Sequence, residues 1–534
     1  MHFAELRQVR EELTGPGGQF EVVRAQVLGR DILTFKNAPP SVREFWLSTA
    51  VWGDRPYLIY EDEVLTYTQA HAHAAAIAAW LWEQGVRPGD RVAIAMRNFP
   101  EWMTIYWACT SIGVAAAGLN AWWTAEEMEY ALNDAAPKVL FADKERLARF
   151  AECGGHKDMA VVGVRLDEYP AGVTPYADVI AHGGAMPQVT VDPDSDACIF
   201  YTSGTTGFPK GAQLTHRGCV ANLMNMLYST MAQALAVERA TGEAPPADPP
   251  PPVSLLTTPL FHVTANNCGA YLTTAAGGAI VLMYKWDAGA ALKLIEKYKV
   301  TGVSGVPVMS REIINHPDFA TTDTSSLTGL SGGGAQVPPD LVLKIDEAVK
   351  TARPTTGYGM TETCGIITSV SGDFFVAKPD SAGPWMPSFE VKVVDDDGRE
   401  LPVGSVGELW VKGAPVIKGY INRPDATEQT ITDGGWLHTG DVARIDEDGF
   451  IFIVARKKDL PDPRLGEEIG VAIHMKPGSA SSAEAVIAHC AEHMSKHKVP
   501  RYVWFLDDPL PRNASGKFLR RELRDELGKQ VVEA

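Results

Sequence analysis

A loop rich in glycine, serine and threonine is the part of this sequence best suited to bind phosphate. Residues 201–211 read YTSGTTGFPKG and follow a strand-like run at residues 197–200. Backbone N–H groups and small hydroxyls in such a loop can approach phosphate oxygens closely, and Lys210 adds a positive charge. The G-x-x-x-x-G-K-[ST] spacing of a Walker A loop is absent. The alternative interpretation of the loop alone is a flexible surface turn.

Length and composition describe the kind of protein that must position this loop. A chain of 534 residues predicts two to four folding units, one of which is a large α/β body. With 45% hydrophobic and 21% charged residues, the composition is that of a globular protein with a substantial core. The formal net charge of −18 argues against broad electrostatic binding to nucleic acid or to an anionic membrane.

The N-terminus and the cysteines bear on location. Residues 1–10 are polar and charged, and no apolar stretch is long enough for a spanning helix, so we expect no standard secretion signal and no integral membrane segment. The seven cysteines are scattered without a C-x-x-C pair, so neither a zinc ribbon nor a disulfide framework is indicated. We therefore expect a cytoplasmic protein.

Hydrophobic patterning predicts alternating strands and helices in the first part of the chain. Strand-like runs at residues 92–95 and 139–141, with a helix over residues 68–83, predict a largely parallel sheet. Strand signals resume at Val253, Ile280 and Val303, and from residue 390 to 454 they predict a smaller β unit. The polar, proline-rich residues 230–252 predict a surface excursion, and the tail after Asp459 mixes a strand-like run at residues 471–475 with two helical patterns.

Five further short motifs carry side chains that can do chemistry. Residues 357–362, GYGMTE, combine an aromatic ring, a hydroxyl and a carboxylate, a set suited to base stacking, phosphate binding and a magnesium ion. Asp441 ends the turn GWLHTGD and is suited to accept the hydrogens of both ribose hydroxyls. The other three motifs are PLFH at residues 259–262, SGGGA at residues 331–335 and PRNASGK at residues 511–517. Taken alone, they would be interpreted as a satisfied core or turn histidine, a tight turn and a solvated lysine, respectively.

Together these motifs make the sequence resemble the adenylate-forming superfamily, which includes acyl-CoA synthetases, aryl-CoA ligases, luciferases and peptide-synthetase adenylation domains. The motifs occur in the family's order, from Leu65-Thr66-Tyr67 near the start to Lys517 near the end. The resemblance implies an α/β fold: residues 1–455 as a large N-terminal domain of two parallel-type sheets plus a small β unit, residues 456–460 as a hinge, and residues 461–534 as a small mobile α+β C-terminal domain.

The resemblance also assigns roles residue by residue. It gives ATP phosphate binding to Thr202, Ser203, Gly204, Thr205, Thr206, Gly207 and Lys210. It gives adenine and ribose binding to Gly333, Gly334, Ala335, Tyr358, Gly359, Met360, Asp441 and Arg456. It gives the acyl pocket to His262, Val263, Asn266, Gly305, Val306, Gly332 and Gly333. It gives catalysis to Lys517, Thr361, Glu362 and His262, with Mg²⁺ held by Glu362 and with Thr205 or Thr206 as further ligands.

The segment after the hinge departs from the family pattern. The hinge residue is expected at Lys458 or Asp459, and the chain then runs through Leu460 into Pro461-Asp462-Pro463. A glycine-rich loop, a helix and a strand usually lie between these points, and none of them is visible. Because that loop normally lines the thiol tunnel, the resemblance implies adenylation more firmly than thioester formation.

The leading interpretation is an AMP-forming acyl-CoA synthetase that uses ATP, Mg²⁺, CoA and a small-molecule carboxylic acid, acting alone or as a homodimer. The acid is expected to be a medium- or long-chain fatty acid ahead of an aryl acid, because the expected pocket is small or apolar and includes no Arg or Lys. Two alternatives remain: an adenylating enzyme that passes the acyl group to another acceptor, and a nucleotide- or acyl-binding protein without turnover. A nucleic-acid ligase is disfavoured by the acidic charge.

Overall fold

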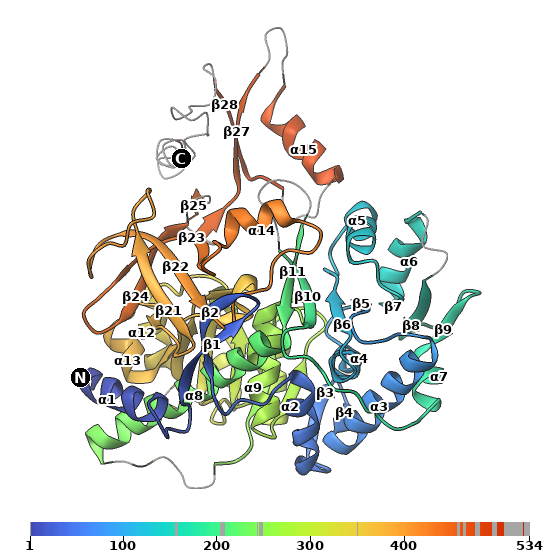
Figure 1. Ribbon diagram of the computed structural model, residues 1–534, viewed down its shortest axis with the longest axis horizontal. Coiled ribbons are helices and arrows are strands. Elements are labelled where there is room, and N and C mark those ends of the chain that lie inside the picture. Colours follow the sequence, from blue (N-terminus) through green and yellow to red (C-terminus); the bar gives the residue numbers. More distant parts are fainter. Residues whose placement is uncertain are drawn as a thin grey trace.

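The computed structural model describes residues 2–154, 159–202, 209–242, 244, 249–349, 351–456, 460–462, 466–475, 481–493, 499–506 and 527. In this part of the chain, two large α/β sheets and a smaller antiparallel sheet form the body, and a C-terminal unit projects from it (Figure 1). The expected α/β fold class is confirmed. The chain enters the body through α1 (Phe3–Thr14), the β1 (Val22–Val27) and β2 (Arg30–Phe35) hairpin, α2 (Val42–Ser48) and the 3-10 helix η1 (Thr49–Trp52).

The first large sheet has the strand order β11-β10-β6-β5-β7-β8-β9. Its strands are β5 (Arg91–Ala95), β6 (Ala115–Gly118), β7 (Val139–Asp143), β8 (Ala160–Val164), β9 (Val173–Pro175), β10 (Asp196–Thr202) and β11 (Lys210–Thr215). Every pairing is parallel except that of β10 with β11. The connecting helices are α3 (Tyr67–Glu83), α4 (Pro100–Ser111), α5 (Ala125–Ala135), α6 (Lys144–Glu152) and α7 (Tyr176–Ala181). These elements confirm the strands predicted at residues 92–95 and 139–141 and the helix over residues 68–83.

The second large sheet has the order β19-β16-β15-β14-β12-β13-β3-β4. Its strands are β3 (Pro56–Tyr60), β4 (Glu63–Thr66), β12 (Val253–Leu256), β13 (Ala279–Leu282), β14 (Gly302–Gly305), β15 (Gly329–Gly333), β16 (Arg353–Gly357) and β19 (Val370–Ser371). The helical elements of this region are α8 (His216–Thr241), the π-helix η2 (Thr264–Ala270), α9 (Tyr271–Ala275), α10 (Ala288–Tyr298), α11 (Pro307–Ile314), η3 (Pro317–Ala320), α12 (Pro339–Ala348) and α13 (Gly372–Ala377). Strands β13, β12, β14, β15 and β16 run parallel, so their carboxyl ends meet at one edge.

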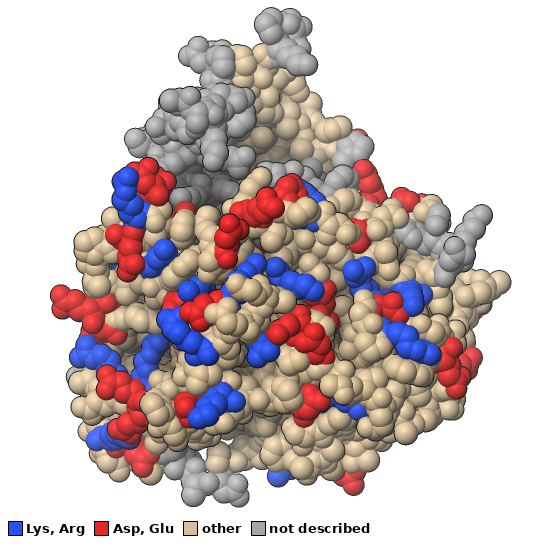
Figure 2. Space-filling view, in the orientation of Figure 1, with Lys and Arg blue, Asp and Glu red and all other residues tan. Residues whose placement is uncertain are grey.

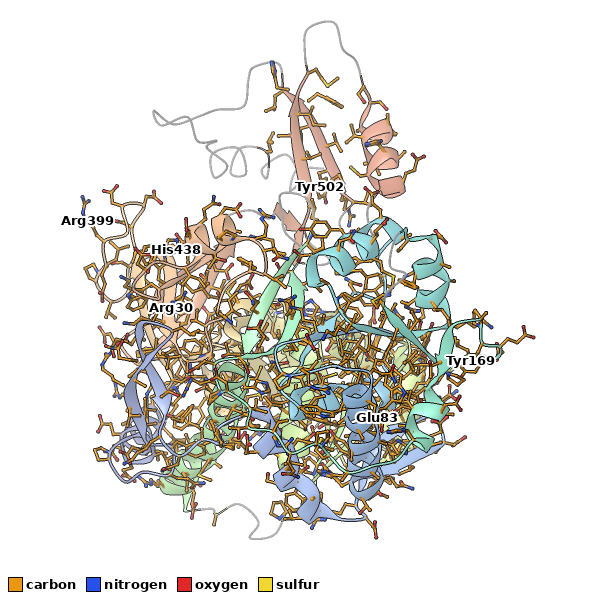
Figure 3. The ribbon with its side chains drawn as sticks, turned by 45° about the vertical axis from the view of Figure 1, so that its right-hand side comes forward. Arg30, Glu83, Tyr169, Arg399, His438 and Tyr502 are labelled. Carbon is orange, nitrogen blue, oxygen red and sulfur yellow. The ribbon has the colours of Figure 1, made fainter. Side chains whose placement is uncertain are left out.

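The third sheet is antiparallel and confirms the β unit predicted between residues 390 and 454. Its order is β20-β24-β23-β22-β21, with β20 (Gly383–Pro384), β21 (Phe389–Val394), β22 (Gly407–Gly413), β23 (Leu437–Ile445) and β24 (Phe450–Arg456). Helix α14 (Pro424–Thr430) lies between β22 and β23 in the sequence, and His438 of β23 stacks on Trp410 of β22 with ring centres 3.9 Å apart (Figure 3). Between the second and third sheets the chain forms β17 (Gly359–Met360), the 3-10 turn η4 (Thr361–Thr363) and β18 (Gly365–Ile366).

The described C-terminal residues form a hairpin followed by a β-α-β unit. The hairpin pairs β25 (Leu460–Asp462) with β26 (Gly466–Glu468). Strand β27 (Gly470–His474) pairs in parallel with β28 (Tyr502–Leu506), and helix α15 (Ala483–His493) connects them. The strand predicted at residues 471–475 is therefore confirmed, and Tyr502 marks this unit in Figure 3. The hinge residues Lys458 and Asp459 lie outside the described residues.

The surface excursion predicted over residues 230–252 is wrong in its first half. Helix α8 continues to Thr241, and Ala232, Gln233 and Ala236 are buried on it. The helix ends where Gly242 takes a left-handed conformation with φ of 77°, which glycine adopts without strain. The first half of the predicted excursion is thus helical, because its apolar residues recur at helical spacing and pack inward.

Charged side chains of both signs are interspersed over the face seen in Figure 2. Many of them are paired, as Arg165 is with Glu63 and Glu101. Among the described residues, no helix is long and apolar enough to cross a bilayer.

Candidate active site

Strands β10 and β11, which flank the glycine- and threonine-rich segment in the sequence, pair at the edge of the first sheet. Thr202, the last residue of β10, lies directly opposite Lys210, the first residue of β11. The loop residues Ser203, Gly204, Thr205, Thr206 and Gly207 lie outside the described residues. The two predicted phosphate ligands that are described therefore flank the base of the loop.

Lys210 is connected to Glu362 through a buried tyrosine. The Nζ atom of Lys210 lies 4.4 Å from the centre of the Tyr420 ring. The Tyr420 hydroxyl donates a hydrogen bond of 2.6 Å to Oε1 of Glu362. Burial and the neighbouring Glu362 raise the pKa of Tyr420, so its hydroxyl stays a neutral donor at physiological pH. The Lys210–Tyr420–Glu362 chain brings the phosphate loop and the GYGMTE motif to one place.

Backbone pairing holds this chain together. The amide of Ile421 donates to the carbonyl of Gly211, and Ala212 forms a bridge with Tyr420. The amide of Ile417 donates to the carbonyl of Glu362 at 3.0 Å. The segment around Tyr420 thus pairs with β11 and also contacts η4, which fixes the distance between the two motifs.

Glu362 has the environment of a magnesium ligand. It and Thr361 are each only 7% exposed. One carboxylate oxygen accepts from Tyr420, while the other, Oε2, makes no hydrogen bond or ion pair with any described residue. Mg²⁺ is commonly bound by one or two carboxylates together with substrate phosphates and water. No group of three or more His, Cys, Asp or Glu in the described ranges forms a metal site without such a substrate. Glu362 therefore fits a magnesium ion that arrives with a nucleotide.

Tyr358 and Asp441 meet across two sheets. The Tyr358 hydroxyl donates to Oδ2 of Asp441 at 2.5 Å, and Asp441 is 5% exposed on β23. Tyr358 directly follows β16 of the second sheet, while Asp441 is the cross-strand partner of Arg456 in the third sheet. The structure thus places the predicted adenine ligand, the predicted ribose ligand and the backbone of the predicted arginine at one junction.

A cavity of about 760 Å³ lies between the second sheet and helices α8 and α9. It extends from Gly333, Gly334 and Gly357 at the carboxyl ends of the strands to Gly302, Gly329 and Arg353 at their amino ends. A Cβ atom added to Gly329 would meet nothing within 4 Å, so the sheet surface there is open. Because Gly357 and Gly359 line the cavity and flank Tyr358, the cavity begins beside the junction of Tyr358 and Asp441.

Only part of the predicted acyl pocket lines this cavity. Val263, Gly332 and Gly333 do, and His262, Asn266, Gly305 and Val306 do not. The Asn266 side chain is fully buried, accepts from the Trp102 indole and donates to Asn267. A Cβ atom on Gly305 would lie 2.4 Å from Oγ1 of Thr257, so this glycine is required for close packing.

Four predicted residues lie at the edge of the arrangement. His262 is exposed at the turn before η2, and its carbonyl accepts from the Asn266 amide. Val306 caps the start of α11, and its side chain lies 3.8 Å from the position of a Cβ on Gly334. Ala335 is exposed in the turn after β15, and Met360 is half-buried in β17.

Sequence reasoning missed several residues of the site. Tyr420 sits in a stretch without a motif, and no signal in the sequence pointed to it. Ser229 and Gln233 lie four residues apart on α8, a spacing that places both on one helix face and that a search for polar residues in the helix would have found. Arg353 lines the cavity although no Arg or Lys was expected there, and it is paired with Asp346 and Asp373.

Lys210 beside a glycine-rich segment, a buried carboxylate suited to magnesium, a junction suited to a nucleoside and an adjoining, largely apolar cavity fit an enzyme that activates carboxylic acids with a nucleotide. Sequence comparison agrees: residues 45–421 match the AMP-binding enzyme family, and residues 460–517 match the AMP-binding enzyme C-terminal domain. The chain belongs to the AMP-binding enzyme family and is an acyl-CoA synthetase, that is, an AMP-forming acid–thiol ligase.

Individual relatives cover nearly the whole chain. A feruloyl-CoA synthase from an Amycolatopsis species is 34% identical over 498 residues, covering 87% of this chain and 94% of that protein. A long-chain-fatty-acid–CoA ligase from Salmonella typhimurium is 31% identical, covering 90% of this chain and 93% of that protein. The solved structure of o-succinylbenzoate CoA synthetase from Bacillus subtilis superposes with a TM-score of 0.73 at 26% identity, covering 90% of this chain and 98% of that one.

Proposed function

We propose that the protein activates a hydrophobic monocarboxylic acid, of the medium- or long-chain fatty-acid class, with ATP and then transfers it to CoA. The carboxylate attacks the α-phosphorus of ATP, the bond to the bridging oxygen of pyrophosphate breaks, and acyl-AMP and pyrophosphate form. The thiol of CoA then attacks the acyl carbon, loses its proton and displaces AMP. The products are acyl-CoA, AMP and pyrophosphate.

The single observation that carries this proposal is the position of the cavity. It starts at the glycines beside Tyr358 and reaches the first residues of β14, β15 and β16, Gly302, Gly329 and Arg353. A parallel strand rises about 3.3 Å per residue, so five residues of β15 or β16 span roughly 13 Å between their end residues. An acid whose carboxylate lies at the nucleotide junction can therefore extend its chain along the sheet. The apolar side chains Val237, Val263 and Leu272 form part of the wall.

The first step brings two anions together, and the surrounding residues must offset their repulsion. Lys210 supplies a positive charge at the base of the phosphate loop, and Glu362 is the residue that would hold Mg²⁺. When bound, that ion supplies charge neutralisation at the phosphate oxygens. Tyr420 keeps the Glu362 carboxylate oriented through its hydrogen bond. Asp441 and Tyr358 hold the nucleoside, so the reacting groups are positioned before reaction.

Lys517 is the residue that we assign to the reacting oxygens. It lies outside the described residues, and residues 460–517 match the family's C-terminal domain up to this lysine. In the proposed cycle, Lys517 bridges carboxylate and phosphate oxygens during adenylation. It then leaves when the C-terminal domain turns about Lys458 or Asp459 for the attack by CoA.

An aryl acid is the second candidate for the substrate. The cavity carries hydroxyl groups from Ser304 and Thr355, which suit a substituted aromatic acid. The relative named feruloyl-CoA synthase, at 34% identity, favours the same class.

The test is pyrophosphate release by the purified chain with ATP, Mg²⁺ and a panel of fatty and aryl acids, with and without CoA. Release that depends on a fatty acid and gives a thioester when CoA is present is the expected result. Faster pyrophosphate release with aryl acids than with fatty acids would indicate that the substrate is an aryl acid. Release without thioester would indicate transfer to another acceptor, and no release with any acid would indicate a binding protein.

A further inference from the structure

The wall of the cavity formed by the sheet carries small and polar side chains in register. Strand pairing aligns Ser254, Gly302, Gly329 and Arg353 in one row across the sheet. Two residues further along each strand, the pairing aligns Ser304 of β14, residue 331 of β15, Thr355 of β16 and Ser371 of β19. Residues two apart in a strand share a face, and the described side chains of both rows line the cavity. A hydrophobic tail would therefore meet Gly302 and Gly329 in the middle of one row and the hydroxyls of Ser304, Thr355 and Ser371 in the other.

Three hydroxyl side chains and one amide gather at one side of the cavity. We call this group the polar corner; it consists of Ser229, Gln233, Thr355 and Ser371. Thr355 and Ser371 are direct cross-strand partners. The Gln233 side-chain oxygen accepts from the Ser371 amide at 2.8 Å and from its hydroxyl at 3.1 Å. The Gln233 side-chain nitrogen donates to Oγ of Ser229 at 2.8 Å. Gln233 is 8% exposed and Ser229 is 5% exposed, so the corner is built into the interior wall.

The corner keeps hydrogen-bonding capacity for a ligand. Within the part of the chain that the structure describes, the hydroxyl of Thr355 has no hydrogen-bond partner, and neither has that of Ser304. The Ser229 hydroxyl accepts from Gln233, which leaves its own hydrogen to be donated. Covering these groups with a plain alkyl chain leaves them without water and without partners, which is unfavourable.

The charges beside the corner disfavour a second carboxylate. Arg353 lines the end of the cavity at the amino ends of the strands, but its guanidinium is bound by Asp346 at 2.6 Å and by Asp373 at 2.9 Å. One positive and two negative charges leave a net negative group at this end. The polar corner therefore suits a neutral hydrogen-bonding group and not an anion.

We propose that the acid activated by this enzyme carries a hydroxyl group remote from its carboxylate, and that the polar corner binds this hydroxyl. The inference rests on the proposed acyl-CoA synthetase activity and specifies its substrate as a hydroxylated acid, aliphatic or aromatic. Thr355 and Ser371 are the specificity-determining residues, since their hydroxyls lie on the sheet face that the substrate tail follows.

The experiment compares kcat/KM for acyl-CoA formation across matched acids. These are dodecanoate, its monohydroxy derivatives with the hydroxyl at successive positions, dodecanedioate, and cinnamate with para-hydroxycinnamate. We expect at least one hydroxylated acid to exceed its unsubstituted partner roughly three- to tenfold, the effect of one added hydrogen bond, and the diacid to be the poorest substrate.

The variants are Thr355→Val, which nearly conserves shape while removing the hydroxyl, and Ser371→Ala as an independent second change. Each is expected to reduce the preference for the hydroxylated acid to less than twofold. The matched control is Thr328→Val, an exposed threonine outside the cavity whose hydroxyl bonds only the Thr301 carbonyl among described residues, and it is expected to retain the wild-type preference.

Thioester formation with equal efficiency for every hydroxylated and unsubstituted pair would overturn this inference while leaving the proposed function intact. A preference that survives in both Thr355→Val and Ser371→Ala would also overturn it. No pyrophosphate release with any acid would overturn the proposed function and this inference together.

Discussion

The hydrogen bond between Tyr420 and Glu362 allows the sharpest prediction from this structure. Tyr420→Phe removes the hydroxyl that donates to Oε1 of Glu362 at 2.6 Å and keeps the ring on which Lys210 rests. Tyr420 is 5% exposed and Glu362 is 7% exposed, so water does not readily replace the lost donor. A hydrogen bond to a charged group contributes about 1.5–3 kcal/mol. At about 1.4 kcal/mol per factor of ten, kcat/KM for adenylation is expected to fall roughly 10- to 150-fold.

The assay is acid-dependent pyrophosphate release as a function of Mg²⁺ concentration. Because the hydrogen bond orients the carboxylate proposed to hold the metal, Tyr420→Phe is also expected to raise the Mg²⁺ concentration that gives half-maximal rate. Tyr169→Phe is the matched control, since Tyr169 is 39% exposed at the surface (Figure 3). A kcat/KM within twofold of wild type, with an unchanged magnesium curve, would refute the reasoning.

Four further predictions test other parts of the account. Glu362→Gln is expected to raise the Mg²⁺ requirement of adenylation with little change in the thermal unfolding midpoint, and an unaltered magnesium titration would contradict its role. Asp441→Asn removes the carboxylate beside Tyr358, so KM for ATP should rise several-fold while KM for the acid changes little; steady-state kinetics with each substrate varied will decide. Lys517→Ala should reduce adenylation far more than thioester formation from supplied acyl-AMP, and equal losses in both half-reactions would exclude the assigned role. Burial lowers the pKa of His216 to about 3, below its unfolded value of about 6.5, so the free energy of unfolding should fall by about 1.4 kcal/mol per pH unit as pH drops through this window. Urea unfolding at several pH values should show a shallower dependence in His216→Gln, and an identical slope would contradict the assignment.

The strands and helices of the two large α/β sheets could be predicted from the sequence because the patterns that indicate them are local. Strand β7 is buried along its whole length, and its first four residues, 139–142, form an apolar run in the sequence. Helix α3 begins with a capping box between Thr66 and Gln69, which is also a local pattern. The last turns of α8 also carry a local signal, apolar residues at helical spacing, but the proline-rich residues that follow led to the prediction of an excursion.

Site residues that belong to a sequence motif could be predicted, whereas residues that reach the site only through tertiary packing could not. Lys210, Glu362 and Asp441 stand in dense motifs, so their sequence context pointed to them. Tyr420 lies close to Lys210 and Glu362 only because its segment pairs with β11. Asn266 follows the PLFH motif, yet it turns into the core toward Trp102, since the π-helix sets its direction. Side-chain direction depends on the whole fold, and a single sequence does not specify it.

The central claim is that acid activation proceeds through an acyl-adenylate, and direct detection of the intermediate tests it most closely. The enzyme, in molar excess over the acid, is mixed with ATP and Mg²⁺, quenched, and analysed by mass spectrometry before and after CoA is added. The account predicts acyl-AMP and pyrophosphate before CoA, and their conversion to acyl-CoA and AMP afterwards. Formation of ADP and phosphate, or of acyl-CoA without acyl-AMP ever appearing, would contradict it.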